Sequence, residues 1–161
     1  MLAASVFVCA DVHAATWFWF SNYQSDTSLI FFDRDSVTRD HNVVTLWTDW
    51  VYSNEYAPSE GVQSEKNKVS IDCRMRTRKL LVSITYDKDG KVIDSFEHTA
   101  KSIDVVPDSV GEKLFKVVCS SGFPKKPSVA LYFEVWKNDP IGLAAAMFES
   151  MRRAKADPAA E

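Results

Sequence analysis

The sequence predicts an α+β fold, in which an antiparallel sheet of about six strands carries a helix across one face and a second helix lies near the C-terminus. Short apolar runs, broken about every ten residues by turn-forming clusters, extend from residue 17 to residue 98. A segment with helical spacing of apolar residues follows them. Of the three cysteines, Cys73 lies in the strand region and Cys119 ends that helical segment.

Six runs of apolar or alternating residues are candidate strands. They are Trp17–Phe20, Ser28–Phe32, Val43–Tyr52, Lys68–Cys73, Lys79–Tyr86 and Lys91–His98. The third run carries apolar side chains on both faces, with Leu46 on one and Trp47 on the other, which predicts a central strand. The last run is more polar and carries Lys91 and Glu97, as an edge strand protected by charge would.

Turn chemistry separates these runs. Residues 33–36 and 39–42 are rich in Asp, Asn and Ser, and Asn42 is suited to a left-handed conformation at a hairpin tip, where His41 would be an exposed turn residue. Residues 53–67 are polar and include Pro and Gly, which predicts a long surface loop and a candidate binding loop. Asp87–Gly90 closes a further hairpin.

The helical segment begins after Pro107. Ser109 is a predicted N-cap, and Glu112 stands three positions later, as in a capping box. The apolar residues that recur at helical spacing are Val110, Leu114, Val117 and Val118. An amphipathic helix ending at Cys119 is expected to cover one face of the sheet.

The N-terminus resembles a cleaved export signal over residues 1–14. An apolar run to Ala10 precedes small residues, and cleavage is expected after Ala14, although no Lys or Arg precedes the run. A buried N-terminal strand is the alternative. The run is too short to cross a bilayer, which takes about twenty apolar residues. Because Val8 precedes Cys9, we do not interpret this cysteine as a lipid attachment site, and it is removed with the signal.

Removal of the signal leaves Cys73 and Cys119, which we expect to pair in an oxidising compartment. Closing a loop of about 47 residues would stabilise the fold by roughly 4 kcal/mol in the chain-entropy model. Two free thiols or two metal ligands are the alternatives. A metal site needs further ligands, and His41 and His98 show no metal-ligand spacing relative to the cysteines.

The amino-acid composition of the chain limits the classes of function that it can serve. A chain of 161 residues with 46% hydrophobic content is consistent with one globular domain. The net charge of -3 does not favour nucleic acid as a partner. No phosphate loop, metal cluster, nucleophile elbow or cofactor motif is present, so the sequence predicts neither an enzyme nor a resident cofactor.

The candidate ligand-binding residues form a basic cluster: Arg74, Arg76, Arg78 and Lys79. If the strand continued through them, the three arginines would share a face and could bind sulfated glycans, acidic protein segments or the propionates of a haem. The alternative is a solvated turn between two strands. Trp17–Phe20 cannot all face one core, so part of this run needs a second covering element or a partner.

Residues 122–161 form a C-terminal extension. The segment 128–136 does not discriminate strand from helix, whereas Asp139-Pro140 predicts the start of a helix over about 140–155. Its apolar side consists of Ile141, Ala144, Met147, Phe148 and Met151. This helix either packs on its own domain or serves as a homo-oligomerisation or partner-binding helix.

Several segments in order resemble the surface-adhesin protein E family of Gram-negative bacteria. They are Phe31-Phe32-Asp33, Ser36-Val37, Arg39, Asn42-Val43-Val44, Leu46-Trp47, Ile71-Asp72-Cys73, Arg78 with Leu80, Ile103, Val106-Pro107-Asp108-Ser109-Val110 and Val118-Cys119. The resemblance covers residues 17 to 121. It implies a six-stranded antiparallel sheet with a helix clamped over it by the Cys73–Cys119 disulfide. It also implies adhesion to host extracellular components such as vitronectin, laminin and plasminogen.

The sequence therefore predicts a signal peptide over 1–14, an adhesin-like domain over 15–121 and an extension over 122–161. The function hypothesis is an exported, non-enzymatic binding protein of the periplasm or outer-membrane surface. The alternatives are a periplasmic envelope structural or assembly factor and a haem- or small-ligand-binding protein. Because the resembling residues specify strands, turns and a disulfide, the fold is expected to transfer more securely than the activity.

Overall fold

The computed structural model describes residues 15–23, 27–56, 61–123 and 140–156. Its strands are β1 (Trp17–Tyr23), β2 (Ser28–Asp33), β3 (Thr38–Asp40), β4 (Val43–Tyr52), β5 (Ser64–Asp72), β6 (Thr77–Tyr86), β7 (Val92–Glu97) and β8 (Ile103–Asp104). The helices are α1 (Val110–Val118) and α2 (Pro140–Ala156). The predicted export signal and the segment 128–136 lie outside the described residues.

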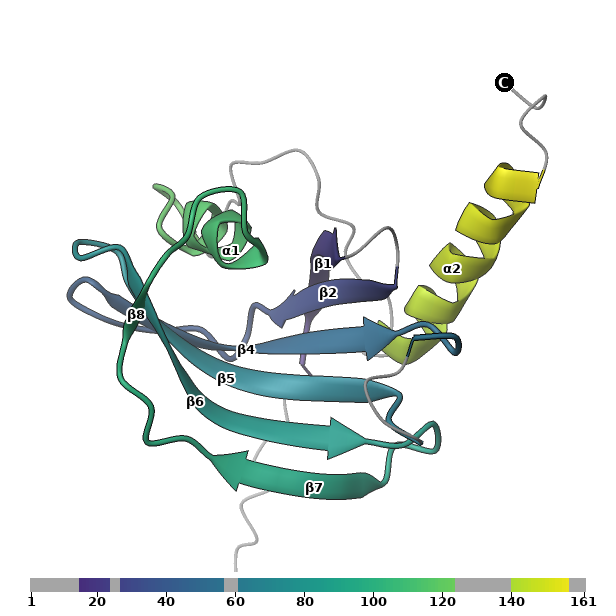
Figure 1. Ribbon diagram of the computed structural model, residues 1–161. Helices are drawn as coiled ribbons and strands as arrows, with labels where there is room; N and C mark the ends of the chain where they lie inside the picture. The colour runs from purple at the N-terminus through teal and green to yellow at the C-terminus, as the bar shows by residue number, and fades with distance from the viewer. Residues whose placement is uncertain (1–14, 24–26, 57–60, 124–139, 157–161) are drawn as a thin grey trace, which may run out of the picture.

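The strands form one antiparallel sheet in the order β1-β2-β4-β5-β6-β7 (Figure 1). The six expected strands are present. Two short strands extend the sheet, because β3 pairs with the part of β4 that β2 does not reach, and β8 pairs with the start of β6. As predicted, β4 is central and buries side chains on both faces, and β7 is an exposed edge strand.

Two local predictions were wrong. At the tip between β3 and β4 the left-handed residue is His41, with φ 51°, and not Asn42. A two-residue hairpin loop needs positive φ at its first position, and the Asn42 carbonyl accepts a hydrogen bond from the Cys73 amide at 2.8 Å. The predicted loop 53–67 ends earlier than expected, because β5 begins at Ser64 and pairs with both β4 and β6.

Helix α1 covers one face of the sheet, called here the α1 face (Figure 1). Its N-cap is Ser109 as predicted, with the hydroxyl accepting a hydrogen bond from the Glu112 amide at 3.1 Å. Helix and sheet share one core, which holds buried side chains from β1, β2, β4, β5 and α1. They include Phe18, Phe20, Ile30, Phe32, Val44, Leu46, Ile71, Leu114 and Val118.

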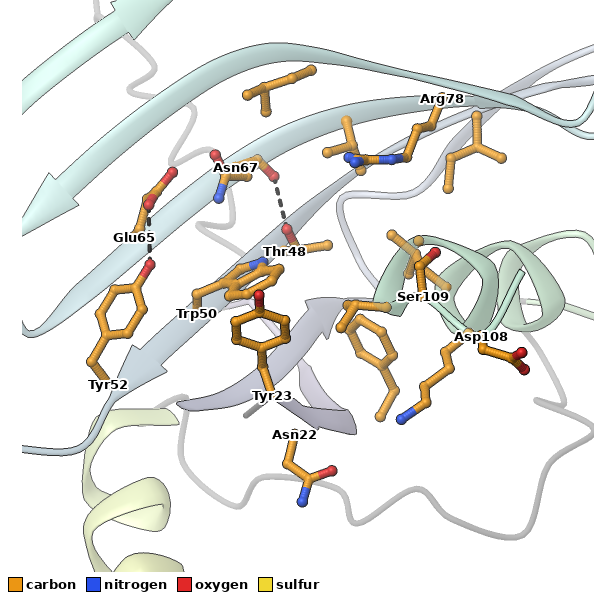
Figure 2. Close-up of a pocket in the computed structure, with 18 residues that line it drawn as sticks. Asn22, Tyr23, Thr48, Trp50, Tyr52, Glu65, Asn67, Arg78, Asp108 and Ser109 are labelled. Carbon is orange, nitrogen blue, oxygen red and sulfur yellow. Dashed lines mark hydrogen bonds between the residues drawn. The ribbon is translucent and has the colours of Figure 1, made fainter. Parts of the chain in front are cut away.

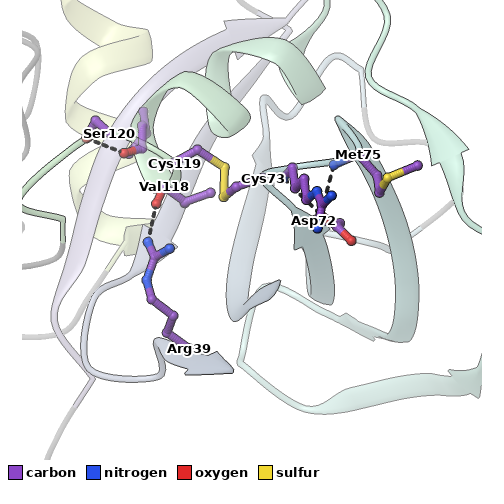
Figure 3. The surroundings of a disulfide bond; sticks show 9 residues. Arg39, Asp72, Cys73, Met75, Val118, Cys119 and Ser120 are labelled. Atoms are coloured by element: carbon purple, nitrogen blue, oxygen red, sulfur yellow. Dashed lines mark hydrogen bonds between the residues drawn. A yellow bond between two sulfur atoms is a disulfide. The ribbon is translucent and has the colours of Figure 1, made fainter. Parts of the chain in front are cut away.

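The expected disulfide joins the end of β5 to the end of α1. Cys73 and Cys119 are bonded, with their Cα atoms 5.5 Å apart (Figure 3). Beside it the Arg39 guanidinium donates to the Val118 carbonyl at 2.8 Å, which satisfies a carbonyl group at the end of the helix. The C-terminal end of α1 is therefore fixed to the sheet both covalently and by hydrogen bonding.

The opposite side of the sheet, called here the α2 face, contacts the C-terminal helix. Its buried core consists of Trp17, Leu29, Phe31, Val51 and Ala144. The predicted apolar side of α2 packs on these residues, so the helix packs on its own chain. The aromatic run of β1 is divided between the two faces, with Phe18 and Phe20 under α1 and Trp17 and Trp19 on the α2 face. Neither described helix is long and apolar enough to span a membrane.

Candidate functional site

An open groove of about 560 Å³ lies on the α1 face, between the first turn of α1 and strands β4, β5 and β6 (Figure 2). Its volume is within the range of small-ligand sites. The groove exists because α1 covers only part of the sheet. The disulfide fixes the C-terminal end of α1, and the groove lies beside the N-terminal end of this helix. Polar side chains of β4, β5 and β6 extend into the uncovered part.

Aromatic side chains form one side of the groove. Tyr23 and Trp50 contact edge to face, with their ring centroids 5.7 Å apart. Next to them the Tyr52 hydroxyl donates to the Glu65 carboxylate at 3.1 Å, as Figure 2 shows. Burial, followed by the charge of Glu65, raises the pKa of Tyr52, so its hydroxyl stays protonated at neutral pH. This end of the groove thus combines ring surfaces with a hydroxyl and a carboxylate.

Asn67 lies in the floor of the groove. Its side-chain oxygen accepts a hydrogen bond from the Ser83 hydroxyl at 2.6 Å, which orients the amide. The residue is only 8% exposed, and its Nδ2 donates to no group in the described parts of the chain. Because Asn67 lines the groove and this amide nitrogen has no acceptor there, the amide is suited to donate to a ligand or a water in the groove.

The other end of the groove carries two cations, Arg78 and Lys113, and one carboxylate, Asp108. Arg78 projects from β6 under α1, and its Nε would lie 3.1 Å from a Cβ placed on Gly111, so the glycine gives the guanidinium room. Lys113 also lines the groove, with its Nζ 3.2 Å from the Ser21 hydroxyl. Arg78 forms no hydrogen bond or ion pair with any residue that the structure describes. Its five donors are therefore available for an anion.

The predicted basic cluster does not form one stripe. The strand does not continue through it, since residues 73–76 form the turn between β5 and β6, as the alternative interpretation had it. Arg74 is exposed in this turn, and Arg76 stacks on Phe115 with its guanidinium carbon 4.6 Å from the ring centroid. Arg78 pairs with Ile71 on the α1 face, and Lys79, the next residue of β6, lies on the other face.

A buried carboxyl lies on the α2 face. Asp49 of β4 is fully buried, and neither of its oxygens has a hydrogen-bond partner within the described ranges. Burial raises its pKa to about 6, while the positive charge of the Lys66 ammonium lowers it in part. Among the described residues no group of three or more His, Cys, Asp or Glu side chains is placed to hold a metal ion.

The sequence did not reveal the groove. Glu65 and Asn67 fell in the predicted loop, and Tyr23 lay beyond the predicted end of the first strand. Their shared role depends on pairing between strands: Glu65 is opposite Trp50, and Asn67 is opposite Thr48. Alternating polar residues at 65 and 67, in step with Val69 and Ile71, were the one available signal that β5 starts early.

One of the comparisons with known proteins gave a match. The family model of surface-adhesin protein E matches residues 17–120, which include all eight strands and α1. No curated protein and no solved structure gave a significant match. The match covers well over half of the 161 residues and includes both cysteines of the disulfide. The chain therefore belongs to the surface-adhesin protein E family.

Proposed function

We propose that this protein is exported and acts as a non-enzymatic adhesin, which binds host extracellular-matrix or serum proteins. The observation that carries the proposal is the family match across residues 17–120. It covers the whole sheet, the covering helix and the disulfide, so the similarity is to a complete scaffold and not to a short motif.

The turn between β5 and β6 is our candidate contact surface for a protein partner. It presents Arg74 and Met75 to solvent, and Met75 is 66% exposed. The Asp72 carboxylate accepts hydrogen bonds from the amides of both residues, each at 2.9 Å (Figure 3). The disulfide from Cys73 to Cys119 ties the start of the turn to the end of α1. The turn is therefore held both by hydrogen bonds and by a covalent bond, which reduces the entropy lost on binding.

The test is binding of the purified chain to immobilised vitronectin, laminin and plasminogen by biolayer interferometry. Arg74→Glu reverses an exposed charge, so we expect association with an acidic partner surface to slow several-fold, more strongly at low salt. Lys88→Glu is the matched control, because Lys88 is an exposed cation in the turn at the other end of β6. Absence of binding to all three proteins, or equal losses in both variants, contradicts the proposal for this turn.

Location separates this proposal from its alternative, a periplasmic envelope factor. An adhesin must be reachable from outside the cell. Labelling of intact cells that produce the full chain with a membrane-impermeant amine reagent should modify the protein to the same extent as a known surface protein. Labelling only after the outer membrane is permeabilised would favour the envelope factor.

A further inference from the structure

We propose that the groove on the α1 face binds a short acidic oligosaccharide, with the sugar rings on the Tyr23–Trp50 surface and a carboxylate on Arg78. This inference does not depend on the proposed adhesion to proteins. It is based on the chemistry of the groove described above and assigns that groove a ligand class.

The groove combines aromatic rings with hydrogen-bonding and charged groups. A lipid chain would offer no hydrogen-bond partner to the Asn67 amide or to the remaining acceptor capacity of the Glu65 carboxylate, which is costly in a partly buried site. A sugar presents C–H groups on its ring faces and hydroxyl groups on its edges. The half-buried ring of Trp50 can receive the faces, while the amide, hydroxyl and carboxylate next to it can exchange hydrogen bonds with the edges.

The backbone of the sheet forms the floor of the groove. The groove lies over β4, β5 and β6, and both edges of β5 are paired along its length. An extended peptide is recognised most directly when it adds to a free strand edge, and the floor of this groove offers none. Side-chain donors and acceptors therefore have to recognise the ligand, as in sugar binding.

The Glu65 carboxylate and the Arg78 guanidinium lie at opposite ends of the groove. Arg78 pairs with Ile71 of β5, and Ile71 is six positions from Glu65 on the same strand. Because a strand rises about 3.3 Å per residue, the two ends of the groove are about 20 Å apart along β5. Arg78 also lies against the first turn of α1, whose partial positive charge favours an anion there. A ligand with a carboxylate at one end and hydroxyl groups along its length matches this arrangement.

The test uses isothermal titration calorimetry with a hyaluronan tetrasaccharide, which carries carboxylates, and with chitotetraose, which is neutral. We expect the wild-type protein to bind the acidic tetrasaccharide at least tenfold more tightly than the neutral one. Arg78→Gln should reduce the affinity for the acidic tetrasaccharide at least tenfold. Lys79→Gln is the matched control, because it removes the same charge from the neighbouring position on the opposite face, and it should change the affinity less than twofold.

Nuclear magnetic resonance provides a second readout that does not depend on a variant. Binding in the groove should shift the side-chain amide signals of Asn67 and the backbone amide of Gly111, and leave the amides of β7 unchanged. No detectable binding of the acidic tetrasaccharide would overturn the proposal, as would equal losses in the two glutamine variants. Tighter binding of tetra-aspartate or of haemin than of the tetrasaccharide would also overturn it and would assign the groove to a peptide or a tetrapyrrole.

Discussion

Replacing the buried carboxyl of Asp49 with an amide should stabilise the protein at neutral pH. The side chain is fully buried and has no hydrogen-bond partner in the described part of the molecule. The cation that acts on it, Lys66, lies over the rings of Trp17 and Tyr86, at 5.4 and 4.9 Å from their centroids, and forms no ion pair with Asp49 within 4.0 Å. Ionisation of Asp49 is therefore poorly compensated in the folded state.

The magnitude follows from linkage. Burial raises the pKa of Asp49 from 3.8 to about 6, so the folded state binds more protons than the unfolded state between these values. Stability consequently falls as pH rises through this window. A pKa shift of roughly two units, at 1.36 kcal/mol each, lowers the free energy of unfolding by about 3 kcal/mol at pH 7.5, where Asp49 is ionised in both states. At pH 4.5, where Asp49 is still protonated in the folded state, the loss is about 1 kcal/mol.

The assay is urea unfolding of the wild type and of Asp49→Asn at both pH values, with the disulfide intact and tryptophan fluorescence as the signal. Any fixed effect of the new amide is the same at the two pH values, so the decisive quantity is the change in the difference between the proteins, about 2 kcal/mol. The control is Asp94→Asn on the exposed strand β7, which should differ from wild type by less than about 0.5 kcal/mol throughout. A stability difference for Asp49→Asn that does not vary with pH would refute the reasoning.

Three further predictions concern α1. Replacing both Cys73 and Cys119 with serine should lower the free energy of unfolding by about 4 kcal/mol, because a loop with a sequence separation of 46 is no longer closed. Urea unfolding measures this loss, and a value below about 1 kcal/mol contradicts the prediction. Ser109→Ala should cost about 1 kcal/mol in the same assay, since the Glu112 amide loses its side-chain acceptor and keeps only the Ser109 carbonyl, while Ser109→Asp should restore the stability. Gly111→Ala should raise the melting temperature slightly, because alanine favours the helix more than glycine does. The same variant should weaken binding of the acidic tetrasaccharide, because the new Cβ displaces Arg78. Unchanged affinity would contradict the placement of the ligand carboxylate on Arg78.

The sequence was sufficient for the elements whose signals are local. Period-two alternation and turn residues predicted the six principal strands, and the Ser109 cap with its apolar spacing predicted α1. Cysteine count and expected compartment predicted the disulfide, and apolar residues on both faces of the third strand predicted its central place. These features depend on residues close together in the chain or on composition.

Only the tertiary structure decided how distant polar residues are used. Glu65 and Asn67 look like loop residues in the sequence, because hydrophobic periodicity carries no information on the cross-strand partners that make them strand residues. The basic cluster was dispersed for a related reason: a turn at residues 73–76 directs Arg74, Arg76 and Arg78 to solvent, to Phe115 and to the groove. Two features define the groove: the direction of side chains around a turn, and the part of the sheet that the helix leaves uncovered. Both depend on how the whole chain packs.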